Sequence, residues 1–213
     1  MPTTDVIIDY ALRALGEYDL AAPQQMTRAD MLALFNSFYQ GEIGKRLKTL
    51  AVHSYDGSDA AHTITAGVGT LPEDFLQPAQ VYDGDAPDNE PLQQIFDIED
   101  KVPDDADCSQ YMLPDLTHIW LFGQTPANTI KLYYYAKPEA LTDSSSSSPS
   151  ALKEEFHLDV FAAKSKEAYE YRNGNYYDAL GTLKAYVVGL LDEIEKAHTV
   201  GTRDDNGRLI KVV

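Results

Sequence analysis

The chain has 213 residues, 44% of them hydrophobic, and its 17 Lys and Arg against 34 Asp and Glu give a formal net charge of −17 at pH 7. This length is enough for one well-packed domain, or for one domain with an inserted lobe, and requires no second core. So acidic a chain argues against a protein that grips nucleic acid, because that affinity comes from cations that displace counterions at phosphates. It is compatible with a protein past which nucleic acid moves without sticking.

Cysteine content and the first residues predict where the protein is made. Cys108 is the single cysteine, which excludes an intramolecular disulfide framework and a multi-cysteine metal site. The opening residues MPTTDV lack a basic region followed by an apolar core, so no signal peptide is expected. No segment reaches the apolar length needed to cross a bilayer. We therefore expect synthesis in a reducing cytoplasm, where the protein stays until it is assembled.

Residues 1–50 are predicted to form two helices of a helical body. From Thr4 to Leu15, apolar residues recur at helical spacing, and Thr3 or Thr4 is available as an N-cap. A longer helix follows Thr27, and Asp30 stands where the partner of a capping box is expected.

Residues 51–143 are predicted to form a β-rich insertion, an antiparallel sheet or a small barrel, because short β-favouring segments alternate with turn residues. The expected strands are two that form a hairpin between residues 51 and 68, with its turn at Asp56 and Gly57, and then 79–82, 92–96, 110–112, 117–122 and 129–135. Between Asp56 and Asp107 there are fourteen carboxylates against one base, Lys101. Much of the insertion must therefore be solvated.

The stretch from Ile119 to Asp143 is predicted to contain a strand, a Gly/Pro/Asn turn and a second strand. In the second strand, residues of one face alternate with Lys131, Tyr133 and Tyr135, the period of two of a sheet with one packed face. We expect Tyr133 and Tyr135 on the face that meets solvent or a neighbouring subunit.

Residues 144–150 are predicted to be a Ser-rich linker, and residues 151–198 a C-terminal helical hairpin. Ser150 is expected to cap the first helix, and Asn173 with Gly174 to end it. The second helix is expected to bury a seam with steps of four and three: Tyr176, Leu180, Leu183, Val187, Leu190 and Ile194. So short a seam is more typical of an antiparallel hairpin than of a free-standing dimer zipper.

Residues 199–213 are predicted to be an extended docking tail. The tail ends in an alternating run: Arg208, Leu209, Ile210, Lys211, Val212 and Val213. Strand character without a core of its own favours docking on a neighbouring subunit. Asp204 and Asp205 interrupt the basic residues of the tail, so the sequence does not identify the surface on which the tail docks.

Motifs that carry chemistry do not occur in the sequence. The five histidines are scattered, and GxGxxG, GxxxxGK[ST] and GxSxG patterns are absent. Asp83, Asp85 and Asp88 suggest a calcium site, but Pro87 occupies the third ligand position of the calcium-loop pattern. We predict no catalytic residues, no cofactor and no metal site, and interpret the 14 tyrosines as protein-contact residues.

The order of these elements carries a resemblance to a known family. A helix pair precedes a β insertion that opens with LPEDF (Leu71–Phe75) and closes with IKLYYYAKPEALTD (Ile130–Asp143), and a helical hairpin follows. In this order and in these phrases, most of the chain resembles the adaptor, or head-to-tail connector, proteins of tailed bacteriophages. The resemblance implies a ring of about a dozen copies beneath the portal protein, with the helices as the ring body and the tail reaching the portal.

We therefore predict an α+β fold: a helical bundle with an inserted antiparallel sheet or small barrel, and an extended tail. The predicted function is that of a non-enzymatic virion subunit at the head–tail interface. It would bind itself, the portal and a tail or neck protein, with no membrane partner, and would let DNA pass through its lumen during ejection. The predicted interface residues are Tyr133, Tyr135, Leu183, Val187 and the tail residues 208–213.

Two alternatives stay open at this point. The chain can be another neck or tail virion protein that meets no portal. It can also be a divalent-cation-dependent enzyme that uses the acidic loops.

Overall fold

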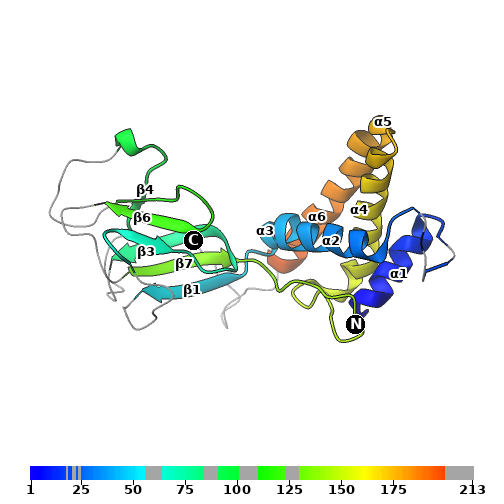
Figure 1. The fold of residues 1–213 in the computed structure, drawn as a ribbon, viewed down its shortest axis with the longest axis horizontal. Coiled ribbons are helices and arrows are strands. Elements are labelled where there is room, and N and C mark those ends of the chain that lie inside the picture. The colour runs from blue at the N-terminus through cyan, green and yellow to red at the C-terminus, as the bar shows by residue number, and fades with distance from the viewer. Residues whose placement is uncertain are drawn as a thin grey trace. The chain divides into compact units, whose positions relative to one another are not determined.

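A computed structural model describes residues 1–17, 19–20, 23, 25–55, 64–83, 91–100, 110–122 and 130–199. The chain divides into two units, which we call the helical unit (Met1–Leu47 with Pro138–Val213) and the β unit (Lys48–Lys137). Each unit encloses its own hydrophobic core. The predicted α+β class is confirmed (Figure 1).

The helical unit contains three long helical segments and one shorter helix. Its elements are α1 (Thr4–Ala14), then α2 (Arg28–Phe38), a π-helix (Tyr39–Ile43) and α3 (Gly44–Leu47), then a 3-10 turn (Glu154–Phe156) and α4 (His157–Arg172), and last α5 (Tyr176–Asp178), a second π-helix (Ala179–Leu183) and α6 (Lys184–Thr199). α4 lies against α1, α2 and α6 (Figure 1). At its centre Phe161 contacts Phe35, with ring centroids 4.7 Å apart, and Phe38, at 6.1 Å.

The predicted capping box of α2 is confirmed. The backbone N–H of Asp30 donates to the Thr27 hydroxyl at 3.1 Å, and the N–H of Thr27 donates to the Asp30 carboxylate at 3.2 Å. Hydrogen bonds from the side chain and from the backbone N–H of Thr27 lower the pKa of Asp30, because they stabilise the charged form of its carboxylate. The sequence thus sets the start of this helix locally.

The C-terminal hairpin differs from its prediction at its start. Ser150 does not cap α4: the helix starts at His157, after the 3-10 turn, and Phe156 occupies its N-cap position. The Ser-rich linker is hydrogen-bonded to α1 and to the segment that precedes it. Ser147 accepts a backbone hydrogen bond from Thr4 at 2.7 Å, and its hydroxyl accepts one from the N–H of Thr142 at 3.0 Å. The linker thereby provides an acceptor for an N–H at the start of α1 that has no partner within the helix.

The predicted break at Gly174 is confirmed, with a φ of 80°, but the predicted seam of the last helix is wrong at its start. Tyr176 and Leu180 are 55% and 54% exposed, whereas Ala179 is fully buried. The reason is the π-helix at Ala179–Leu183, which adds a residue to one turn and so rotates everything before it. After the π-helix, Val187 and Ile194 are buried as predicted.

The β unit contains two sheets. One has the order β1 (Leu50–Tyr55), β7 (Ile130–Ala136), β3 (Phe75–Asp83) and is antiparallel. The other has the order β2 (Val68–Thr70), β6 (His118–Phe122), β5 (Gln110–Met112), β4 (Gln93–Gln94), and its β4–β5 pair is parallel. Within the described residues, neither sheet closes into a barrel.

The predicted alternation of β7 is confirmed, and its neighbours in the sheet are distant in sequence. Ile130, Leu132 and Tyr134 are buried, and the residues between them are half-buried. β6 and β7, the two strands predicted between Ile119 and Asp143, lie in different sheets. β1 pairs with β7, and residues 56–63 of the expected hairpin, including its turn at Asp56 and Gly57, lie outside the described residues. Side-chain burial in the common core, rather than closeness in sequence, decides these pairings.

Candidate self-assembly surface

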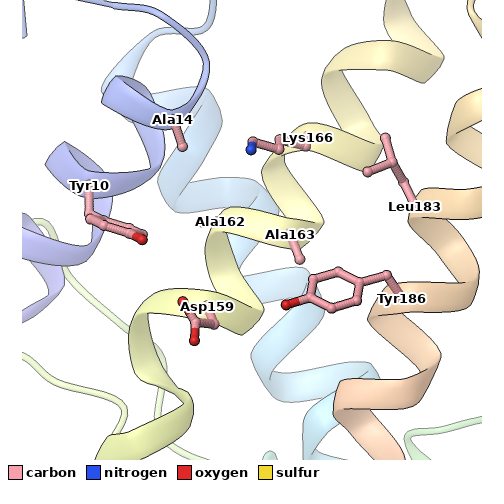
Figure 2. A pocket seen from close by; sticks show the side chains of 8 residues that line it. All are labelled: Tyr10, Ala14, Asp159, Ala162, Ala163, Lys166, Leu183 and Tyr186. Atoms are coloured by element: carbon pink, nitrogen blue, oxygen red, sulfur yellow. The ribbon is translucent and has the colours of Figure 1, made fainter.

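A groove with a volume of about 220 Å³ crosses the outer face of the helical unit (Figure 2). Its floor is α4, and its two walls come from α1 on one side and from the last helix on the other. The lining residues are Tyr10, Ala14, Asp159, Ala162, Ala163, Lys166, Leu183 and Tyr186.

The floor of the groove exists because α4 has small residues between its two neighbours. Val160 and Phe161 point into the core of the unit, and the next two positions are Ala162 and Ala163, which fill little space. Tyr10 and Tyr186 rise on either side and are 43% and 54% exposed (Figure 2). The result is an amphipathic concave surface: apolar at its floor, with two phenol hydroxyls at its walls.

The charges of the groove come from α4. Asp159 and Lys166 are both exposed and stand seven residues apart, two turns along the same helix face. The lining therefore carries one formal charge of each sign. This balance suits a protein surface with polar and apolar parts better than it suits a highly charged ligand.

A second exposed surface, which we call the tip, lies at the turn between α4 and α5. It consists of three tyrosines and a leucine: Tyr171, Tyr176, Tyr177 and Leu180. Tyr177 is 87% exposed, and the rings of Tyr171 and Tyr176 meet edge to face with centroids 5.1 Å apart. The turn itself is held by Asn175, whose amide donates to Glu170 at 3.0 Å and to Asp178 at 2.8 Å. The tip is therefore a fixed convex surface.

Ion pairs between helices brace the unit that carries both surfaces. Arg46 pairs with Asp192 at 3.2 Å and also with Glu195, which joins α3 to α6. Lys164 pairs with Glu42 at 3.0 Å and lies 5.1 Å from the ring centroid of Phe38. These contacts fix α4 and α6 relative to the N-terminal helices, and so help to define the walls of the groove.

The interface residues predicted from the sequence lie in different parts of the structure. Leu183 lines the groove, but Val187 is 1% exposed and packs in the core of its own subunit. Tyr133 and Tyr135 are half-buried in the β unit, where Tyr133 meets Tyr82 edge to face at 5.7 Å. The tail residues 208–213 lie outside the described part of the chain.

The structure also assigns groove residues that the sequence interpretation did not single out: Tyr10, Ala14, Asp159, Lys166 and Tyr186. The available signal was a pair of tyrosines off the apolar stripe of their helices. Aromatic residues at such positions indicate a contact surface. Periodicity alone does not show that Tyr10 and Tyr186 face each other across a third helix.

Acidic residues are concentrated in the β unit. Residues 48–137 contain 15 Asp and Glu against 4 Lys, a net charge of −11, whereas the other residues contain 19 against 13 Lys and Arg, a net charge of −6. The β unit is therefore the main source of the negative field of the subunit.

The described ranges contain neither a metal site nor a membrane-spanning helix. No group of three potential ligands comes together there, while the side chains of Asp83, Asp85 and Asp88 lie outside them. Nor does any helix of the described residues have the length and apolarity to span a membrane.

Comparison with known proteins gives the family. No curated protein matches the chain. The family model described as SU10 adaptor protein matches residues 4–204, which cover the β unit and most of the helical unit. A match over nearly the whole chain agrees with the order of helices, β insertion and helical hairpin described above. The chain therefore belongs to the SU10 adaptor protein family, a family of phage adaptor proteins, and is a structural component of the virion.

Proposed function

We propose that this adaptor subunit assembles with copies of itself into a ring of about a dozen subunits at the head–tail interface. The ring binds the portal protein on one side and a tail or neck protein on the other, and DNA passes through its lumen during ejection. The observation that carries the proposal is the pair of exposed surfaces, groove and tip, on a single braced helical unit. Surfaces that are rich in tyrosine and open to solvent are typical of protein interfaces.

The negative net charge of the subunit supports a role as a conduit for DNA. The chain has a net charge of −17, most of it in the β unit. A wall of this sign offers DNA no release of counterions and therefore no affinity that would hold it during passage. Assembly in the host cytoplasm precedes this step.

The remaining contacts are assigned from the sequence. Residues 200–213, which follow the end of α6 at Thr199, act as a docking tail, and the last six residues pair with the portal as an added strand. Tyr133 and Tyr135 contact a neighbouring subunit through the partly exposed face of β7. Leu183 acts at the groove, and Val187 supports it from the core.

Cryo-electron microscopy of the full-length chain mixed with portal protein tests this function. We expect portal-bound rings that show rotational symmetry in projection. A variant truncated after Val200 is the matched control, and we expect it to keep its helical circular dichroism and to lose portal attachment. Persistent monomers of the full-length chain, with no portal complex, would overturn the proposal. A complex with a tail protein alone would instead favour a neck or tail component that meets no portal.

A calorimetric titration separates the adaptor from the enzymatic alternative. An enzyme that uses the acidic loops must bind Ca²⁺ or Mg²⁺ with a saturable heat. A solvated acidic surface gives no such heat. Saturable binding together with turnover of a substrate would contradict a purely structural role.

A further inference from the structure

We propose that the tip of one subunit inserts into the groove of the next, so that copies of this chain join head to tail through two different surfaces. This inference rests on the self-assembly proposed above and names the surfaces that carry it. The tip supplies Tyr177 and Leu180, and the groove receives them between Tyr10 and Tyr186 over the alanines of α4.

The size of the groove selects its occupant. Sites for drug-sized molecules have volumes of about 300–1,000 Å³. The groove has about 220 Å³, which is small for such a molecule and suits one or two side chains. Tyr177 is the most exposed large hydrophobic residue of the described chain at 87%, so its side chain can enter a concave site without rearrangement of its own subunit.

The chemistry of the two surfaces is complementary. Both carry tyrosines, whose hydroxyls stay hydrogen-bonded at a partly wet interface while the rings are buried. The groove has Asp159 and Lys166, and the tip is flanked by exposed Arg172 and Asp178. With Glu170, which Asn175 also holds at the tip, each surface presents charges of both signs, so that opposite charges can pair across the contact.

A subunit cannot fill its own groove with its own tip. Lys166 and Tyr171 belong to one continuous helix, five residues apart, so they are separated by about 7.5 Å along its axis at about 1.5 Å per residue. The helix holds the tip away from the groove. Only a second copy can bring the two surfaces together.

Two different surfaces on one body produce a particular kind of assembly. A contact between identical patches joins two copies and stops, whereas a contact between different patches leaves a free surface at each end. Repetition then gives a closed ring, or a filament when the rotation does not close. The π-helix contributes to both surfaces, because Leu180 and Leu183 lie on it: the first is exposed at the tip, and the second lines the groove.

A complementation experiment tests the head-to-tail contact. Ala14→Trp fills the groove from the partly exposed end of α1, and Tyr177→Asp places a charge at the tip. We expect each variant alone to lose ring formation, with and without portal. An equimolar mixture should give heterodimers and no larger species in light scattering, because one intact tip then meets one intact groove.

The controls keep the test independent of folding. Ala14→Ser leaves the groove open, and Tyr177→Phe keeps the aromatic side chain at the tip, so both variants should assemble as the parent does. All four variants should melt like the parent. If the parent forms rings but the two blocking variants also form them, the groove–tip contact is wrong and the proposed function stands. If the parent itself forms no ring on portal, the proposed function is wrong, and with it the groove–tip contact that rests on it.

Disulfide trapping gives a second measurement. In a Cys108→Ser background, Ala14→Cys and Leu180→Cys are made as separate variants and mixed under oxidising conditions. We expect cross-linked pairs in the mixture and several-fold fewer with either variant alone. Efficient cross-linking of Leu180→Cys with itself would show a tip-to-tip contact and would overturn the proposal.

Discussion

Arg28 and Asp143 form a two-point ion pair, in which Nε and Nη2 of the arginine donate to the two carboxylate oxygens at 2.8 and 2.7 Å. Arg28 lies at the start of α2, and its remaining nitrogen also pairs with Asp9 of α1. Asp143 belongs to the segment that leads from β7 into the C-terminal helices. The pair thus holds together three parts of the chain that meet in the helical unit.

Loss of this clamp should destabilise the helical unit in a pH-dependent way. Arg28 lowers the pKa of Asp143 through the side-chain hydrogen bonds, and burial opposes this only in part. The clamp therefore stabilises the fold at pH values above the ordinary aspartate pKa of about 3.9, and this contribution disappears as the pH falls through the lowered pKa.

We expect Arg28→Met to cost about 1–2 kcal/mol in urea unfolding at pH 7 and much less near pH 2. Lys184→Met, at an exposed position of α6, is the control and should cost almost nothing at either pH. An equal loss for Arg28→Met at both pH values would show that packing, and not the ion pair, is the cause.

The side chain of Asn36 makes both of the hydrogen bonds that a backbone partner would make with Leu141. Its amide donates to the Leu141 carbonyl at 3.0 Å and accepts from the Leu141 N–H at 2.6 Å, and Leu141 is buried. Asn36→Ala leaves both backbone groups without a partner and should cost about 1–3 kcal/mol of unfolding free energy. Asn36→Asp keeps the acceptor and should lose less in the same denaturation experiment. Similar losses for both would contradict a role for the acceptor.

Two glycines should respond in opposite directions to alanine. A Cβ at Gly181, in the second π-helix, meets no atom within 4 Å, whereas at Gly69 in β2 it would lie 3.2–3.3 Å from Ile119, Ile64 and Tyr55. Gly181→Ala should raise the unfolding free energy by about 0.5–1 kcal/mol through helix propensity. Gly69→Ala should lower it by about 1–3 kcal/mol through overpacking. Thermal melts of the two variants compare them directly.

Carboxylates placed at Val187 and Leu183 should separate folding from assembly. Val187 is 1% exposed in the core, so Val187→Asp buries an unpaired charge at a cost of several kcal/mol, on the order of the whole margin of stability. Leu183 is partly buried at the groove, so Leu183→Asp should leave a cooperative melt and reduce ring formation. A Val187→Asp melt like that of the parent would show that this face is not the core.

Buried tyrosines should make the β unit sensitive to alkali. Burial raises the pKa of Tyr111 to about 12, and burial also raises that of Tyr55. Stability from such groups is present below the unfolded pKa of about 10 and is lost as the pH rises through the raised value. We expect unfolding between about pH 10 and 12, with tyrosinate absorbance and circular dichroism changing together.

Tyr111→Phe removes one of these groups and should shift the alkaline transition to higher pH. The control is Tyr177→Phe, at the exposed tip, which should leave the transition where it is. An unchanged midpoint for Tyr111→Phe would mean that other groups drive the transition.

The sequence by itself determined the features that arise within one element. The capping box at Thr27 and Asp30, the break at Gly174 and the alternation along β7 follow from local hydrogen bonding, from a positive φ and from strand geometry. Composition likewise gave the acidic character. Short-range physics is sufficient for these features, so their prediction does not depend on the rest of the fold.

Tertiary structure alone decided which elements meet. β6 and β7 follow one another in sequence and yet join different sheets, because each strand pairs where its buried face finds a core. In the last helix one π turn exchanged Leu180 for Ala179 on the buried face, and this exchange left an apolar residue exposed at the tip. The groove between Tyr10 and Tyr186 likewise depends on three helices packing at once (Figure 2). A periodic pattern reports the buried face of one element, but the partner of that face is set by burial summed over the distant parts of the chain.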